Sequence, residues 1–126
     1  MKKLVTFVFG LLLGALSWGM AYALSGKFEP FDSDVGFFAT QTILSSAAFL
    51  AGFKKGISDS FVLVAGGYIG MNSYAYTFGG SEAQAWAFLG AITTVALLFY
   101  PVLAGLLGSI VRHVRSRLRQ RETKEG

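Results

Sequence analysis

Residues 4–24 read LVTFVFGLLLGALSWGMAYAL, a run of 21 residues without a charged side chain. As an α-helix rising 1.5 Å per residue, this run is roughly 32 Å long and matches the hydrocarbon core of a membrane, which is about 30 Å thick. Uncharged apolar runs of this length are typical of membrane spans. The run therefore predicts a membrane-spanning helix and decides the fold class.

Three more apolar segments follow, at about 36–53, 61–78 and 83–111. Hydrophobic residues make up 53% of the 126 residues, more than a soluble core of that size needs, and the few charged residues cluster between the segments. Short connections predict that consecutive helices pack as antiparallel neighbours. We expect an all-α membrane protein, a four-transmembrane-helix antiparallel bundle that forms a single integral membrane domain over residues 1–126.

The lysines and arginines predict the orientation of these segments. All except Lys27 precede the first segment, lie between the second and third, or follow the fourth. Lys27 shares its connection with Glu29, Asp32 and Asp34. Because positive charge stays on the cytoplasmic side, we expect a multi-pass protein of a bacterial-type inner (plasma) membrane with both termini cytoplasmic.

One alternative for the first segment stays open. Lys2 and Lys3, an apolar stretch and then Ala21-Tyr22-Ala23 resemble a secretory signal with its cleavage site. The apolar stretch is longer than the 7 to 15 residues usual for such a signal, which favours an uncleaved span. Cleavage would leave three spans and an external N-terminus.

Polar residues at the segment boundaries predict where the helices begin. Ser33 or Asp34 can cap the second helix, and Ser58 the third. Ser81-Glu82-Ala83-Gln84 has the form of a capping box before the fourth. Within the fourth segment, Pro101 removes the backbone donor for the Leu97 carbonyl, which predicts a kink.

Small residues recur at helical spacing in three of the segments. Such rows let helix backbones approach closely within a membrane. They can serve contacts inside the chain, which is the commoner use, or contacts with another membrane protein. The expected helix-contact residues are Gly10, Gly14 and Ser17 in the first segment, Gly66 and Gly70 in the third, and Gly105 and Ser109 in the fourth.

Two short likenesses raise the question of a duplicated hairpin. The stretch Gly19-Met20-Ala21-Tyr22-Ala23 resembles Gly70-Met71-Asn72-Ser73-Tyr74-Ala75. The stretch Ala48-Phe49-Leu50 resembles Ala87-Phe88-Leu89. The two likenesses have different spacings along the chain. We therefore attribute them to chance unless the two hairpins superpose.

A set of polar residues forms a possible pore or polar site. The amide of Gln41 cannot face lipid without losing its hydrogen bonds, so it must face protein or water. Gly66 and Gly67 weaken the third helix just before its polar half. These groups can bond between helices or line a path for a solute. The set comprises Gln41 and Ser45 in the second segment and Asn72, Ser73, Tyr74 and Thr77 in the third.

The tail, residues 112–126, is strongly basic. Val111, Val114 and Leu118 recur near helical spacing among its arginines, which predicts a short amphipathic basic C-terminal helix on the inner membrane surface. A docking helix for a cytoplasmic partner is the alternative. The residues expected to bind anionic lipid headgroups are Arg112, Arg115, Arg117, Arg119 and Arg121.

Several function classes are excluded by what the sequence lacks. It has no cysteine and a single histidine, His113, so thiolate metal sites, disulfides and histidine pairs for haem or zinc are impossible. Charged residues do not occur mid-membrane, where ion-coupled carriers place them, and no phosphate loop or nucleophile elbow occurs. We expect no enzymatic activity, catalytic residue, metal or cofactor.

The sequence favours a non-enzymatic inner-membrane protein that acts as an accessory, assembly or self-associating subunit through its small-residue faces. The expected partners are anionic and other membrane lipids, together with another membrane protein or a second copy of the chain. The net charge of +4 lies beside apolar segments, so nucleic acid is not expected. An oligomeric channel or facilitator for a small or uncharged solute is the alternative, and a holin-like or immunity protein is a third possibility.

Overall fold

The computed structural model describes residues 2–27, 33–85 and 87–125, the side chains of residues 82, 83 and 125 excepted. All regular secondary structure in these residues is helical. The elements in chain order are α1 (Lys2–Ser25), α2 (Asp34–Lys54), α3 (Ile57–Phe78), α4 (Gly80–Ala85), α5 (Ala87–Thr94), the 3₁₀ helix η2 (Val95–Leu98) and α6 (Phe99–Glu125).

Three helical stretches are long and apolar enough to cross a membrane: α1, α2 and the 38 residues Ala87–Lys124. The predicted third span corresponds to α3, which is 22 residues long but is not among them. Asn72, three tyrosines and three glycines lower the mean hydropathy of α3. The chain is therefore all-helical within the described residues and compatible with a membrane-spanning protein.

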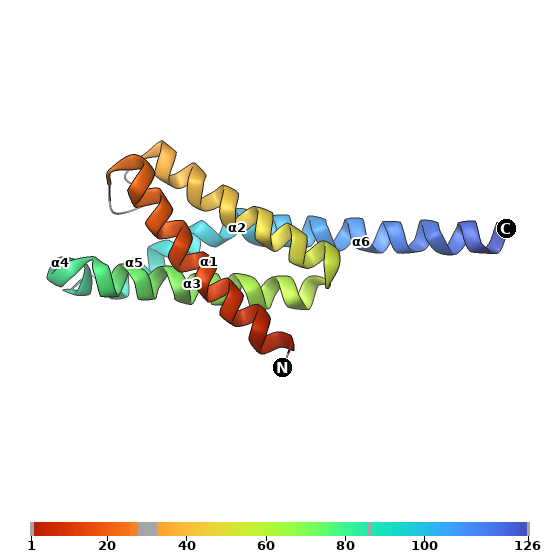
Figure 1. The fold of residues 1–126 in the computed structure, drawn as a ribbon, viewed down its shortest axis with the longest axis horizontal. Helices are drawn as coiled ribbons and strands as arrows, with labels where there is room; N and C mark the ends of the chain where they lie inside the picture. The colour runs from red at the N-terminus through yellow and green to blue at the C-terminus, as the bar shows by residue number, and fades with distance from the viewer. Residues whose placement is uncertain (1, 28–32, 86, 126) are drawn as a thin grey trace.

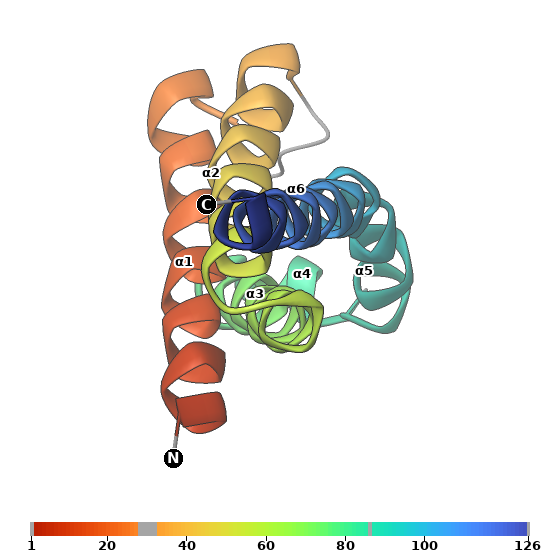
Figure 2. The same ribbon diagram turned by 90° about the vertical axis from the view of Figure 1, so that its right-hand side faces the viewer.

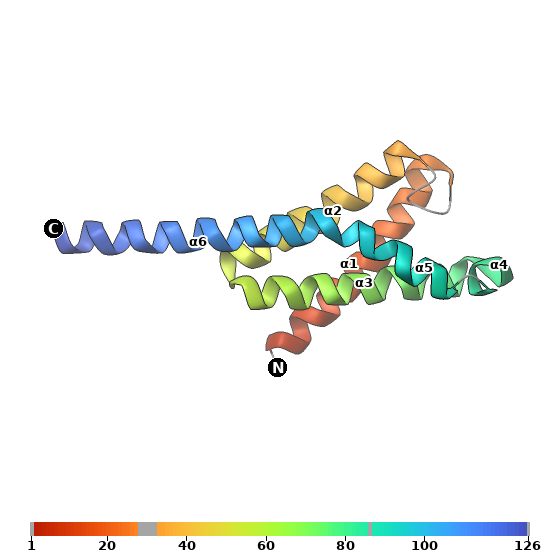
Figure 3. The ribbon, with the colours of Figure 1, turned by 180° about the vertical axis from the view of Figure 1, so that it is seen from behind.

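The helices form two pairs that cross each other. Figure 1 shows α3 and α6 running in opposite directions along the long axis, with α1 crossing α3 obliquely and α2 beside α6. Seen along that axis, α3 and α6 appear nearly end-on next to α1 and α2 (Figure 2). The view from behind shows α6 continuing without a break far past the other helices (Figure 3).

The helix starts agree with the sequence in one place and differ in another. Ser33 caps α2, because its side chain accepts a 2.9 Å hydrogen bond from the Gly36 amide. The prediction that Ser58 caps α3 is wrong: the cap is Gly56, and Ser58 lies inside the helix. The turn from α2 to α3 is so short that it needs the backbone φ of 111° at Gly56, which a glycine adopts without strain.

The predicted fourth segment is not one regular α-helix, because the 3₁₀ helix η2 lies between α5 and α6. Ser81 and Gln84 lie inside α4 rather than ahead of a helix, so the prediction of a capping box before a span beginning at 83 is wrong. The helix begins at Gly80, whose φ of 78° lets the chain turn earlier than the polar pattern indicates. Gln84 then donates to the Tyr76 carbonyl of α3 at 3.2 Å. Glu29 and Asp32, expected in the outer connection, lie outside the described residues.

The apolar core is small and most large apolar side chains face outward. One buried cluster joins α1, α2, α3 and η2 and contains Trp18, Leu44, Met71 and Leu97. In contrast, Phe38 and Phe88 are 66% and 81% exposed. Exposed aromatic and aliphatic side chains on several helices are what lipid contact requires and what water disfavours.

Candidate functional site

The predicted helix-contact glycines of α1 lie against α3. A Cβ atom on Gly10 would overlap the carbonyl of Leu63, and one on Gly14 would overlap the carbonyl of Gly67. Ser17, one turn further, is buried and donates to the Gly14 carbonyl at 2.8 Å. The two backbones are thus in direct contact, which only glycine permits.

The glycines of α3 complete the same contact from the other side. A Cβ atom on Gly66 would overlap the Phe7 carbonyl, and one on Gly70 would overlap the Leu11 carbonyl. All four glycines are buried. These faces are therefore occupied within the chain and are not open to a second membrane protein.

A second close contact joins α2 to α6. Gly105 and Ser109, which the sequence analysis selected, meet Gly52 there, since a Cβ atom on Gly52 would lie 3.1 Å from the Ser109 amide nitrogen and would overlap the Gly105 carbonyl. A Cβ atom on Gly108 would likewise overlap the Phe49 carbonyl. Sequence reasoning missed Gly52 and Gly108, although Ala48-x-x-x-Gly52 and Ala104-x-x-x-Gly108 both have the small-residue spacing that signals such contacts.

Of the candidate polar-site residues of α2, Gln41 lies against η2, whereas the Ser45 hydroxyl is buried without a hydrogen-bond partner among the described residues. The Gln41 amide donates to the Leu97 carbonyl at 3.0 Å. This is the carbonyl that Pro101 leaves without its helical donor. Pro101 is fully buried in the first turn of α6, directly after the 3₁₀ residues of η2, so the helix is irregular where the sequence predicts a kink.

The candidate polar-site residues of α3 do not join that group. Asn72 donates to the Tyr68 carbonyl at 2.9 Å and to the Thr94 hydroxyl of α5 at 3.0 Å. Ser73 and Thr77 lie on an exposed face of α3, and the ring of Tyr74 packs 4.7 Å from that of Phe78. The structure thus places the selected residues in separate environments rather than around one space.

Polar contacts at one end of the molecule, here called the basic end, connect all the long helices. Lys3 of α1 forms an ion pair of 2.5 Å with Asp59 in the first turn of α3, and it also bonds Ser58. The hydrogen bond from Lys3 lowers the pKa of the Asp59 carboxyl below its ordinary value of 3.8, although desolvation opposes this. Lys55, after α2, reaches Thr6 of α1 at 3.4 Å.

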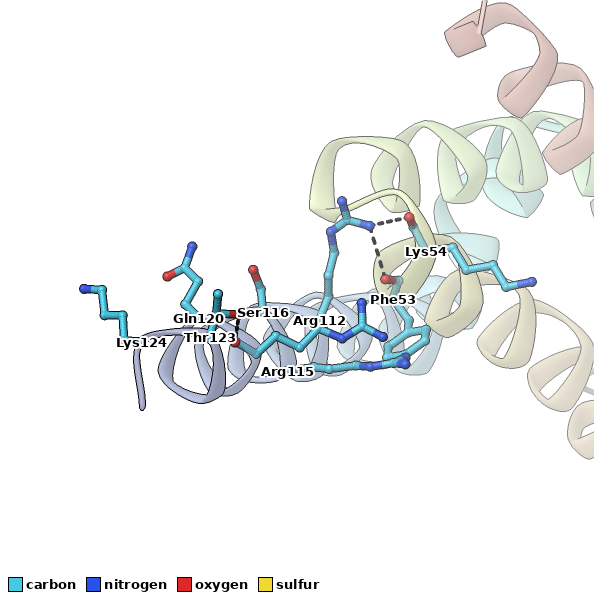
Figure 4. A pocket seen from close by; sticks show the side chains of 9 residues that line it. Phe53, Lys54, Arg112, Arg115, Ser116, Gln120, Thr123 and Lys124 are labelled. Atoms are coloured by element: carbon cyan, nitrogen blue, oxygen red, sulfur yellow. Dashed lines mark hydrogen bonds between the residues drawn. The ribbon is translucent and has the colours of Figure 1, made fainter. Parts of the chain in front are cut away.

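The second half of α6 begins at this end. The Arg112 guanidinium donates to the carbonyls of Phe53 and Lys54, the last residues of α2 (Figure 4). Arg115 lies over the ring of Phe53, 5.6 Å from its centroid. Cations are stabilising at a helix C-terminus and over an aromatic face, so these two arginines hold α6 to the end of α2.

An open groove of about 910 Å³ runs from the end of α2 along α6. Guanidinium, ammonium, hydroxyl and amide donors line it, which is chemistry suited to carboxylates or phosphates. Arg117 and Arg121 do not line the groove. The lining residues are Phe53, Lys54, Arg112, Arg115, Ser116, Arg119, Gln120, Thr123 and Lys124.

The tail differs from the expected surface helix. It is helical, but it belongs to the 27-residue α6 and is not a separate element. Val114 and Leu118 are about half exposed, at 51% and 53%. The tail therefore continues the direction of α6 instead of turning aside.

No protein-family model matches the chain, and neither a curated protein nor a solved structure matches it. Among the described residues, no three His, Asp or Glu side chains come together as a metal ion would require. The basic groove and the extended part of α6 remain the most distinctive chemical features of these residues.

Proposed function

We propose that this chain is a non-enzymatic inner-membrane accessory protein with four spans, whose basic helical arm docks onto an acidic surface of a cytoplasmic partner protein. The arm is defined as residues 112–125. The observation that carries the proposal is the unbroken course of α6 from the close contact with α2 into this arm.

The placement of α3 supports a fourth span. It is 22 residues long, about 33 Å, and its glycines are buried against α1. The residues that lower its hydropathy face protein in part: Gly66, Gly70 and Asn72 all contact other helices. Polar groups that are satisfied within the protein are tolerated at membrane depth.

Because the glycine faces are occupied within the chain, we expect the surface that contacts a partner protein to lie elsewhere. Four glycines were candidates for contact with a partner, but each packs against the backbone of the other helix of the α1–α3 pair. They are Gly10, Gly14, Gly66 and Gly70. Gln41 and Asn72 likewise donate to neighbouring helices, which favours an accessory role over a solute path. The arm contacts the end of α2 only at its base, through Arg112 and Arg115, and the side chains of residues 112–124 are exposed.

The arm is too long and too stiff for a simple lipid anchor. Residues 112–125 extend about 21 Å as a helix, whereas each headgroup region is only about 5 to 8 Å thick. Lying flat on the membrane would require a sharp bend, yet residues 109–125 contain no glycine or proline. Gly108, the nearest glycine, is held against Phe49.

The chemistry of the arm favours an acidic protein surface. Its cationic residues outnumber its acidic ones, Glu122 and Glu125. Val114 and Leu118 add an exposed apolar stripe between the charges. Helices with such a stripe bind apolar grooves, and complementary charge around the groove steers and orients them.

The position of the arm can be tested by spin labelling. Because the chain has no cysteine, the variant Leu118→Cys accepts one label at a defined place. In vesicles rich in phosphatidylglycerol, the label should be accessible to a water-soluble nickel reagent and shielded from oxygen dissolved in lipid. A label immersed in the bilayer would contradict the proposal and identify the arm as a lipid anchor.

The partner can be tested by cross-linking in cells. A photoreactive amino acid at Leu118 should form an adduct with one discrete protein, and replacing Arg117, Arg119 and Arg121 by glutamate should abolish it. Placing the same group at Phe88, which is 81% exposed on α5, provides the control for lipid contact. Adducts with lipid alone from both positions would refute a docking arm.

A further inference from the structure

The contact between α1 and α3 repeats itself with the two helices exchanged. Gly10 meets Leu63, and Gly66 meets Phe7. Advancing Gly10 by 56 positions gives Gly66, and moving Leu63 back by 56 gives Phe7, the same separation that divides Lys3 from Asp59. The contacts of Gly14 with Gly67 and of Gly70 with Leu11 are related in the same way.

The contact between α2 and α6 follows the same rule. Gly52 meets Gly105 and Ser109, and Gly108 meets Phe49 and Phe53. Adding 56 to Gly52 gives Gly108, and the contacted residues of the two glycines also differ by 56. The same separation divides Gln41 from Leu97. One pair of parallel helices can acquire a local two-fold relation by chance. Two pairs that share one separation are related by a common operation.

Two polar contacts lie between equivalent positions. The Lys3–Asp59 ion pair and the Gln41–Leu97 hydrogen bond both join residues separated by 56. A two-fold rotation places each residue and its equivalent on opposite sides of the axis. Two equivalent residues can therefore be in contact only where both lie close to that axis. Since α1 and α3 both begin at the basic end, this axis runs between the helices toward that end.

Identical residues in the sequence also recur at this separation of 56 positions. The likenesses first noted, at Gly19 and at Ala48, use other spacings and are unrelated to it. Identical residues at the correct separation include most of the contact glycines. They are Val8 and Val64, Gly10 and Gly66, Gly14 and Gly70, Ser17 and Ser73, Ser25 and Ser81, Ala48 and Ala104, Leu50 and Leu106, and Gly52 and Gly108.

We infer that the chain is a tandem repeat of one 56-residue helical hairpin, and that its halves bind each other through a single self-complementary surface. The surface consists of Gly10, Gly14 and Gly52 on the first hairpin and Gly66, Gly70 and Gly108 on the second. Each hairpin therefore has the other copy of the repeat as its partner. Such an isologous interface is how two identical subunits form a dimer.

The departures from the repeat identify where the second hairpin has specialised. Ser45 corresponds to Pro101, and the 3₁₀ helix η2 (Val95–Leu98) corresponds to residues 39–42, which lie within the regular helix α2. Gly56, which ends the first hairpin in a turn, corresponds to Arg112, where the arm begins. The arm is thus an extension that the first hairpin lacks.

Paired glycine substitutions test the repeat. Gly10→Ala should lower the melting temperature in detergent by the same amount as Gly66→Ala, and Gly52→Ala by the same amount as Gly108→Ala. Overpacking of this kind corresponds to losses of roughly 4 to 12 °C. Gly90→Ala is the control, since nothing lies within 4 Å of its Cβ position. Losses that differ more than about twofold within a pair would overturn the repeat.

A nicked full-length chain gives a second measurement that does not depend on those variants folding. A protease site inserted between Lys55 and Gly56 is cleaved after purification of the intact protein. Both halves should stay together on size exclusion and keep their helical circular dichroism, because the interface alone holds them. Separation of the halves after cleavage would refute a self-complementary interface between hairpins.

Discussion

The side-chain amide of Gln41 supplies the hydrogen bond that Pro101 takes away from the Leu97 carbonyl. In a regular helix the amide of residue 101 would donate to this carbonyl, but proline has no amide hydrogen. Gln41 and Leu97 are both buried, at 7% and 0% exposure. A glutamine that seems suited to a solute path therefore completes the backbone of a neighbouring helix.

Replacing Gln41 with methionine should destabilise the protein by about 1 to 3 kcal/mol, because the buried Leu97 carbonyl loses its donor. Thermal unfolding in detergent measures the loss. Pro101→Ala restores the backbone donor, so Gln41→Met should cost clearly less in that background. Equal costs with and without Pro101 would show that the hydrogen bond does not compensate for the proline.

Replacing Gly70 with leucine should disrupt the contact between α1 and α3, since even a Cβ atom there overlaps the Leu11 carbonyl. We expect a loss of about 3 kcal/mol or more, at or beyond the upper end for overpacked positions. Gly19→Ala is the matched control on α1, because its Cβ would lie 3.4 Å from the flexible end of Tyr74. Similar melting temperatures for both variants would contradict the close approach.

The Lys3–Asp59 ion pair should make stability depend on acid pH. Hydrogen bonding by Lys3 lowers the pKa of Asp59 in the folded state below its ordinary 3.8, so the folded protein binds this proton less tightly than the unfolded chain. The stabilisation is complete above the ordinary pKa and is lost as pH falls through the lowered folded value.

Asp59→Asn is the measurement of that dependence. The variant should melt below the wild type at neutral pH, and the difference should shrink as pH falls through the acid range. Lys3→Met should show the same convergence, because it removes the other half of the pair. A difference between variant and wild type that does not change with pH would exclude ionisation of Asp59 as its cause.

Arg112 should hold the base of the arm more firmly than the other arginines do. Arg112→Gln removes the charged donor to the Phe53 and Lys54 carbonyls, at a cost of about 1 kcal/mol or less for an exposed helix end. A spin label at Leu118 should become more mobile in this variant. Arg117→Gln, which removes the same charge from outside the groove, should leave the label unchanged.

Local features of the sequence predicted the helical class and most of the element positions. Runs such as residues 4–24 identify α1 because apolarity and length are properties of a single segment. The predicted helix boundaries were wrong at two glycines, Gly56 and Gly80, which begin helices by adopting positive φ. The local composition does not indicate this backbone conformation at either position. The sequence pattern pointed instead to polar caps at Ser58 and Ser81.

The sequence by itself determined that this chain is helical, apolar, free of cysteine and basic at its end, because each of these follows from residue identity or local periodicity. Only the tertiary structure decided which small residues meet, that Gln41 serves Leu97, and that contacts recur over a separation of 56. Contacts between distant segments depend on how helices cross. The crossing is set jointly by all the glycines that allow backbones to touch, and no single segment encodes it.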